Sequence, residues 1–233
     1  MRNNNSTAKH KSKEMIYQSI RRDIISHKLN PGQLVTEDEL AKKYNVSRTP
    51  IREILRKLEY EELVKITNKR ILIYEMTNKD IEEVLHIRMI LESNAARAAA
   101  QCITDKQIKE LEKIEENLDK AIKEEDSVLS FETDEILHDF IMVTAGNMRV
   151  RKIMYHLMGQ ILRIRYISGH KPGRIKTTGE EHKRIIHAIK NRDAFDAEEK
   201  MKEHILSTIE LLLPSEEMDV KFRKVLEGLK YDF

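Results

Sequence analysis

The sequence has few of the residues that cross-link a chain or interrupt helices. Its 233 residues include one cysteine, four prolines and seven glycines. The single cysteine, Cys102, excludes an intrachain disulfide and is typical of a reducing compartment; we expect it to be a small buried residue near a helix end. With 40% hydrophobic and 35% charged residues, the scarcity of glycine and proline predicts a mainly α protein with a packed core.

Long apolar runs are also absent. No run approaches the roughly 20 residues that a membrane-spanning helix needs, so we expect no membrane partner. The first residues, MRNNNSTAKHKSK, are polar and basic and lack the apolar segment of a secretory signal. We therefore predict a cytoplasmic protein in which residues 1–11 form a disordered basic arm.

The net charge of +2 conceals two oppositely charged parts. Residues 1–75 contain 16 Lys and Arg against 10 Asp and Glu, a net charge of +6. Residues 76–233 contain 26 against 30, a net charge of −4. A basic N-terminal part followed by an acidic part predicts a nucleic-acid-binding module joined to a domain that does not touch nucleic acid.

Two short helical patterns in the basic part are joined by a tight turn. The first opens with Thr36 and Glu39, which have the spacing of a capping box, and Asn45 begins the turn. The second, which Ser47 can cap, repeats apolar residues at the helical period: Ile51, Ile54, Leu55 and Leu58. The exposed start of such a helix is suited to the DNA major groove, where its first residues meet base edges.

Two short β-rich runs follow directly, Leu63–Thr67 and Ile71–Tyr74, with the basic tip Asn68-Lys69-Arg70 between them. A small hairpin in this place predicts a wing, so residues 12–76 form a winged helix-turn-helix domain. The alternative for the basic tip alone is a solvated group of charges.

The remainder, residues 77–233, consists of long helical patterns separated by short breaks. It predicts an antiparallel all-helical bundle of six or seven helices. The longest break is His170–Gly179. The predicted helices are 78–102, 104–124, 127–145, 148–167, 179–191 and 194–213, with a short terminal helix at about 216–227.

Residues 31–64, PGQLVTEDELAKKYNVSRTPIREILRKLEYEELV, resemble the winged helix-turn-helix of the GntR family of bacterial transcription regulators. Residues 77–213 resemble the all-helical effector domain (FCD) of its FadR-type branch. That resemblance rests on Arg88 and Glu92, the run Asp134–His138, Ala145-Gly146-Asn147, Glu181-His182 and His204. It implies a homodimer with a small ligand cavity in each bundle. One departure is that Ile71 follows Arg70 where the family usually has glycine, which puts the minor-groove contact of the wing in doubt.

Arg48 and Arg52 lie four residues apart and share the exposed face at the start of the second helix. The planar fork of arginine can donate two hydrogen bonds to O6 and N7 of guanine, and nearby hydroxyl groups can reach phosphates. The alternative for any one arginine is a solvated surface charge. We predict that the DNA-binding residues are Ser47, Arg48, Thr49, Arg52, Lys69 and Arg70.

One carboxylate and three imidazoles interrupt the apolar faces of the predicted bundle helices: Asp134, His138, His182 and His204. Asp134 and His138 are four residues apart, so their side chains point the same way. Imidazole and carboxylate are common ligands of Zn, Ni, Mn and Fe, and the resemblance implies a divalent metal at these four positions. We predict a metal site, with zinc as the first candidate. The alternative is a set of hydrogen-bonded core residues.

The sequence contains no HExxH motif, nucleophile elbow or phosphate-binding glycine loop, so we predict that the protein is not an enzyme. We expect the metal and nearby cations to hold a small organic acid. Arg88 on the first bundle helix and Arg163 on the fourth are candidates for binding its carboxylate. The alternative for both arginines is an ion pair on a helix surface.

Together these patterns predict a dimeric regulator whose two recognition helices meet a short inverted repeat in double-stranded DNA. The resemblance implies a repressor that a small carboxylate effector releases. Two other functions remain open. One is a direct metal sensor, and the other is a metalloenzyme fused to a DNA-binding domain.

Overall fold

The computed structural model describes residues 13–67, 70–214, 216, 218–220, 222–224 and 226. The chain divides into two compact units, Met1–Glu75 and Met76–Phe233, which we call the winged unit and the helical unit. The predicted basic arm at 1–11 and the wing-tip residues Asn68 and Lys69 lie outside the described residues.

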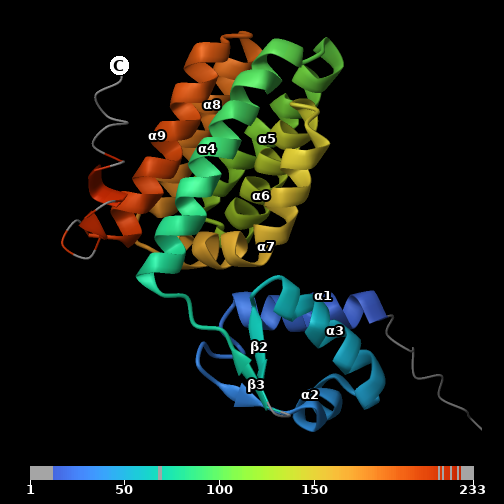
Figure 1. Ribbon diagram of the computed structural model, residues 1–233. Coiled ribbons are helices and arrows are strands. Elements are labelled where there is room, and N and C mark those ends of the chain that lie inside the picture. The colour runs from blue at the N-terminus through green and yellow to red at the C-terminus, as the bar shows by residue number, and fades with distance from the viewer. Residues whose placement is uncertain are drawn as a thin grey trace, which may run out of the picture. The chain divides into compact units, whose positions relative to one another are not determined.

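The winged unit combines three helices with a small sheet (Figure 1). Its antiparallel strands have the order β1-β3-β2. Strand β1 was not predicted because its two residues are too short for an alternating pattern; Leu34 and Val35 pair with Leu72 and Ile71. The elements are α1 (Lys13–Ile25), β1 (Leu34–Val35), α2 (Glu37–Tyr44), α3 (Arg48–Tyr60), β2 (Val64–Thr67) and β3 (Arg70–Ile73).

The local signals predicted for α2 and α3 are present except for the side-chain cap of Ser47. The Thr36 side chain accepts from the backbone N–H of Glu39, whose carboxylate accepts from the backbone N–H of Thr36, which completes the capping box. Asn45 ends α2 in the left-handed conformation, with φ of 55°. Ser47 occupies the N-cap position of α3, but its side chain makes no capping hydrogen bond. The four predicted apolar residues of α3, Ile51, Ile54, Leu55 and Leu58, are all buried.

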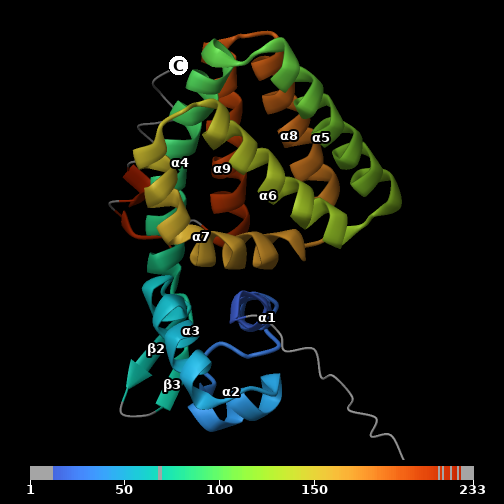
Figure 2. The ribbon, with the colours of Figure 1, turned by 90° about the vertical axis from the view of Figure 1, so that its right-hand side faces the viewer.

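The helical unit is an antiparallel bundle that forms one hydrophobic core (Figures 1 and 2). Helix α4 packs along α9, and the second half of α7 lies across one end of the bundle. Beyond Pro214, Met218, Phe222 and Leu226 are buried in the same core. The helices are α4 (Asn78–Cys102), α5 (Asp105–Glu124), α6 (Ser127–Thr144), α7 (Met148–Gly169), α8 (Arg174–Lys190) and α9 (Ala194–Leu212).

The predicted mainly α architecture is confirmed, with two local corrections. Helix α8 begins at Arg174, so the predicted break at 170–179 is too long. Arg174 is buried, and its guanidinium donates hydrogen bonds to Ser207 and Thr208 on α9. Such contacts between helices carry no periodic signal. Cys102 ends α4 but is exposed, not buried as expected. None of the helices described is long and apolar enough to cross a membrane.

Candidate metal centre and DNA-binding surface

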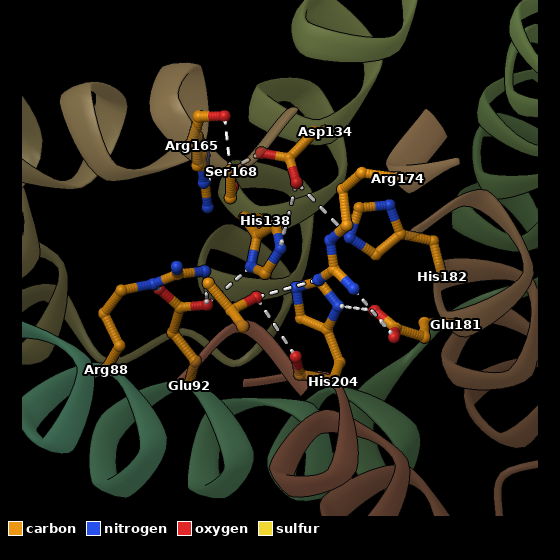
Figure 3. Close-up of polar contacts among 11 residues, drawn as sticks. Arg88, Glu92, Asp134, His138, Arg165, Ser168, Arg174, Glu181, His182 and His204 are labelled. Carbon is orange, nitrogen blue, oxygen red and sulfur yellow. Dashed lines mark hydrogen bonds and ion pairs between the residues drawn. The ribbon is translucent and has the colours of Figure 1, made fainter. Parts of the chain in front are cut away.

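Three helices of the helical unit bring the four predicted ligand residues together (Figure 3). Asp134 and His138 come from α6, His182 from α8 and His204 from α9. Each offers one donor atom, and these atoms all lie within 4.8 Å of one another. The Oδ1 atom of Asp134 lies 3.4 Å from Nε2 of His182 and 3.7 Å from Nε2 of His138.

The three imidazoles are deeply buried, with His182 at 0% exposure. Burial and the neighbouring His204 hold the pKa of His182 well below its ordinary 6.5. Burial and His138 lower the pKa of His204 in the same way. Burial also lowers the pKa of His138, although Glu92 opposes it. The imidazoles are therefore neutral near pH 7, which is the form that binds a metal.

Two of the histidines are oriented by buried glutamates. The Nδ1 atom of His138 lies 2.5 Å from Oε2 of Glu92 on α4. The Nδ1 atom of His204 lies 2.8 Å from Oε2 of Glu181 on α8. Because an ionised carboxylate only accepts, each Nδ1 atom carries the proton, and Nε2 keeps its lone pair for the centre.

The fourth ligand residue, Asp134, is supported by a cation. Its Oδ2 atom lies 2.8 Å from Nε of Arg165 on α7, while its Oδ1 atom faces the histidines. Burial raises the pKa of the Asp134 carboxyl, but opposing interactions, of which that with the Arg165 guanidinium is the largest, hold that pKa below its ordinary value. Asp134 is thus ionised and offers a carboxylate oxygen to the centre.

This donor set fits a divalent metal ion. The Nε2 atom of His138 and both ring nitrogens of His182 are buried and have no hydrogen-bond partner within the described part of the chain. Buried nitrogen atoms of this kind are costly unless something binds them. Three neutral imidazoles and one carboxylate match the ligands that zinc and related divalent ions take.

Sequence reasoning missed several partners of the ligand residues. Glu181 was not predicted to contact any of them, yet its carboxylate lies 2.8 Å from Nδ1 of His204 and 3.1 Å from Nη1 of Arg174. Arg174 also donates to Ser207 and Thr208 on α9, at 2.9 and 2.8 Å. The contacts of Glu181 with His204, and of Arg174 with Ser207 and Thr208, join separate helices, so no spacing in the sequence predicts them.

The two predicted effector arginines are both buried, with Arg88 at 1% and Arg163 at 2% exposure. Arg88 donates from Nε and Nη2 to the two carboxylate oxygens of Glu92, at 2.9 and 3.2 Å. This is an ion pair within α4, but an interior one rather than the surface pair considered as the alternative. Asp134 pairs with Arg165, a buried arginine that was not predicted to belong to the site. The spacing of Arg88 and Glu92, four residues apart on one helix, was a signal for their pair.

In the winged unit, the predicted DNA-reading residues of α3 lie on one exposed surface. Ser47, Arg48, Thr49 and Arg52 are all exposed at the N-terminal end of the helix, opposite its buried apolar face. Arg70 is exposed at the start of β3. Lys69 lies outside the described residues. Arg48 and Arg52 form ion pairs with Asp38 and Glu37 respectively.

Comparison with known proteins finds a matching protein family for each of the two units. Residues 12–70 match the family described as "Bacterial regulatory proteins, gntR family", and residues 83–207 match the FCD domain family. One curated relative is the uncharacterized HTH-type transcriptional regulator YdhC of Bacillus subtilis, 28% identical, with the alignment covering 82% of this chain and 84% of the relative. Another is the HTH-type transcriptional repressor RspR of Escherichia coli, 28% identical over 82% of this chain and 85% of its own.

Solved structures share the fold. Escherichia coli McbR/YncC superposes with a TM-score of 0.72 at 20% sequence identity, over 86% of this chain and 96% of its own. A GntR-type transcriptional regulator from Rhodococcus superposes with a TM-score of 0.69 at 18% sequence identity, over 86% of this chain and 97% of its own. The relatives are regulators, in agreement with the prediction that this chain is not an enzyme. The chain therefore belongs to the GntR family, in the branch that carries an FCD domain, and is a DNA-binding transcription regulator.

Proposed function

We propose that the protein is a repressor whose affinity for its operator is controlled by a small carboxylate effector bound at a divalent metal in the helical unit. The observation that carries this proposal is the convergence of four buried donors, Asp134, His138, His182 and His204, within 4.8 Å. A divalent metal there would act as a Lewis acid and bind a carboxylate oxygen. Zinc is our first candidate, with nickel, manganese and iron as alternatives.

The charges around the site favour an anionic effector. The buried carboxylates of Glu92, Asp134 and Glu181 are matched by three buried guanidinium groups, those of Arg88, Arg165 and Arg174. With neutral imidazoles, these six groups have no net formal charge. A divalent metal adds +2 in an environment with little water, where uncompensated charge is costly. A carboxylate effector supplies the compensating charge.

We assign effector binding to Arg88 and Arg163, as the sequence predicted, and add Arg165. Arginine suits this role because its planar fork donates two parallel hydrogen bonds to a carboxylate. Arg165 already holds one oxygen of Asp134, so it is positioned to contact an anion that joins the ligand set. Arg88 keeps Glu92, and through it His138, in place.

For DNA binding we propose a homodimer that presents two copies of α3 to an inverted repeat, since a twofold protein matches a twofold site. Ser47, Arg48, Thr49 and Arg52 would contact the major groove, and Lys69 and Arg70 the backbone or minor groove. The effector need only prefer one arrangement of the dimer. A coupling of about 1–3 kcal/mol changes DNA affinity roughly 5- to 150-fold. The relative RspR of Escherichia coli is a transcriptional repressor, which supports repression as the direction of regulation.

A direct metal sensor is the second candidate. The same ligand set supports it, but the four candidate ligand residues are at most 8% exposed, and such burial favours a metal that exchanges slowly. A resident metal suits an effector pocket better than it suits a sensor.

The test is elemental analysis of the purified protein together with a thermal-shift screen of small carboxylic acids, each with and without a chelator. The proposal predicts near-stoichiometric metal and at least one acid that stabilises the protein only while metal is bound. His204→Ala serves as the matched protein that lacks a ligand. Acids that stabilise the chelated protein and His204→Ala equally would overturn the metal-anchored pocket. A metal that exchanges freely and changes DNA binding by itself would favour the sensor.

A further inference from the structure

Two acidic residues lie against the DNA-reading arginines. The Nε atom of Arg52 is 2.7 Å from Oε2 of Glu37, and the Nε atom of Arg48 forms an ion pair with Oδ1 of Asp38. Both acids belong to the first turn of α2, and both arginines to the start of α3. Each arginine is thus held by its own carboxylate from the neighbouring helix.

This arrangement is not explained by the capping of α2. The capping box of that helix uses Thr36 and Glu39, so neither Glu37 nor Asp38 is required for it. The side chains of both arginines are 62% exposed, with Asp38 at 60% and Glu37 at 28%, and ion pairs of exposed side chains contribute little to stability. A carboxylate on a surface that meets phosphates also repels them. An effect on DNA recognition accounts for both features.

We infer that Glu37 and Asp38 are specificity-determining residues that position Arg52 and Arg48 for guanine. Once Nε is held by a carboxylate, rotation of the planar guanidinium is restricted, and the two terminal nitrogens are directed away from the acid. Those nitrogens are the pair that can donate to O6 and N7 of a guanine. The same arginines, so held, are less able to swing onto a phosphate, a contact that carries no sequence information.

The carboxylates also act against the wrong DNA. At a site without guanine the arginines gain no base contact, while Glu37 and Asp38 still face the polyanion. Specificity is a difference between two affinities, and a repulsive group that is tolerated only at the correct site increases that difference. The two acids therefore lower affinity for random DNA more than affinity for the operator.

The inference rests on the placement of α3 in the major groove proposed above, and the experiment separates the two. The full-length protein first selects its binding sequence from duplexes with a randomised centre. Affinities for the selected duplex and for a scrambled duplex are then measured for wild type, Glu37→Gln, Asp38→Asn and Arg52→Ala. Glu14→Gln is the matched control, because it removes the same charge from α1 of the winged unit, where Glu14 faces Lys57 rather than an α3 arginine.

We expect Glu37→Gln and Asp38→Asn each to lower the ratio of selected to scrambled affinity by about fivefold or more, the lower end of what one arginine–guanine pair discriminates. Most of the change should come from tighter binding to scrambled DNA. Glu14→Gln should shift both affinities alike and keep the ratio. Circular dichroism of each variant checks the fold. Because Glu37→Gln and Asp38→Asn are independent substitutions, the inference can still be tested if one of the two variants does not fold.

The inference would be wrong if the ratio of selected to scrambled affinity were the same in Glu37→Gln and Asp38→Asn as in Glu14→Gln. It would also be wrong if these variants gained affinity for both duplexes and the ratio stayed unchanged. If Arg52→Ala binds the selected duplex as tightly as wild type, the proposed placement of α3 in the major groove is wrong, and the inference that depends on it is wrong as well.

Discussion

Glu181 precedes His182 in the sequence, yet its carboxylate accepts a hydrogen bond from Nδ1 of His204, on the next helix, at 2.8 Å. The same carboxylate holds Nη1 of Arg174 at 3.1 Å. One buried glutamate thus connects α8 to α9 and fixes which nitrogen of His204 faces the candidate metal centre. Partners of this kind commonly affect metal affinity almost as strongly as the ligands themselves.

Glu181→Gln should weaken metal binding roughly 10- to 100-fold, because the neutral amide is a poorer acceptor for the His204 N–H and leaves Arg174 without its anion. A chelator competition titration measures the affinity. Glu180→Gln is the matched control: Glu180 adjoins Glu181 in the chain but is exposed, so its substitution should leave metal affinity unchanged. Equal affinities in the two variants would show that Glu181 does not position His204.

His138→Ala and His204→Ala should each lose most of the bound metal, because each removes one of four donors from a site that has little else to offer a cation. Elemental analysis of the purified variants measures this directly. His170→Ala, which removes an exposed histidine at the end of α7, should retain the metal content of wild type. Unchanged metal in both ligand variants would reduce the four residues to a polar part of the core.

Arg52→Ala should reduce affinity for the selected operator by about 1–3 kcal/mol and relax its preference at one position, as expected for loss of one arginine–guanine contact. Metal content should not change, since the metal centre lies in the other unit. Fluorescence anisotropy with labelled duplex measures the affinity. Arg184→Ala, which removes an exposed positive charge from α8, is the control. An operator affinity that matches this control would contradict our assignment of the recognition surface.

Patterns within single elements predicted much of this structure. The capping box of Thr36 and Glu39 placed the start of α2, and the apolar period identified the buried face of α3. The four-residue spacing of Asp134 and His138 put both side chains on one face of α6, and the structure brings them together with His182 and His204. Such features were predictable because each depends on residues a few positions apart.

Contacts between elements could not be predicted in this way. The pairs Glu181–His204, Arg165–Asp134 and Glu92–His138 join residues on different helices, and no periodicity relates their positions. The early start of α8 has the same origin, since Arg174 is fixed by side chains of α9. The four candidate ligand residues were therefore predictable, while the residues that orient them were not.

Tyr44→Phe should destabilise the winged unit by about 1.5 kcal/mol near neutral pH. The Tyr44 hydroxyl donates to Oδ2 of Asp23 at 2.7 Å and so joins α2 to α1. Burial and this hydrogen bond raise the pKa of Tyr44 above its ordinary 10.0. Because the folded phenol holds its proton more tightly than the unfolded one, the stabilisation is complete below pH 10.0 and declines as pH rises past it.

Urea unfolding of the full chain, with wild type and Tyr44→Phe compared at each pH, measures this difference. Tyr60→Phe, at a tyrosine that is 66% exposed in the same unit, is the control and should cost little. A difference between wild type and Tyr44→Phe that stays constant or grows above pH about 10 would contradict the assigned role of the Tyr44–Asp23 pair.

The most direct test of metal-anchored control is a titration of operator affinity with the carboxylic acid that gives the largest thermal shift, before and after removal of the metal by chelator. We predict that the acid changes operator affinity roughly 5- to 150-fold in the metal-bound protein and has no effect once the metal is removed or His204 is replaced by alanine. An equal change in operator affinity with and without metal, or no change in operator affinity at saturating acid, would contradict metal-anchored control of DNA binding.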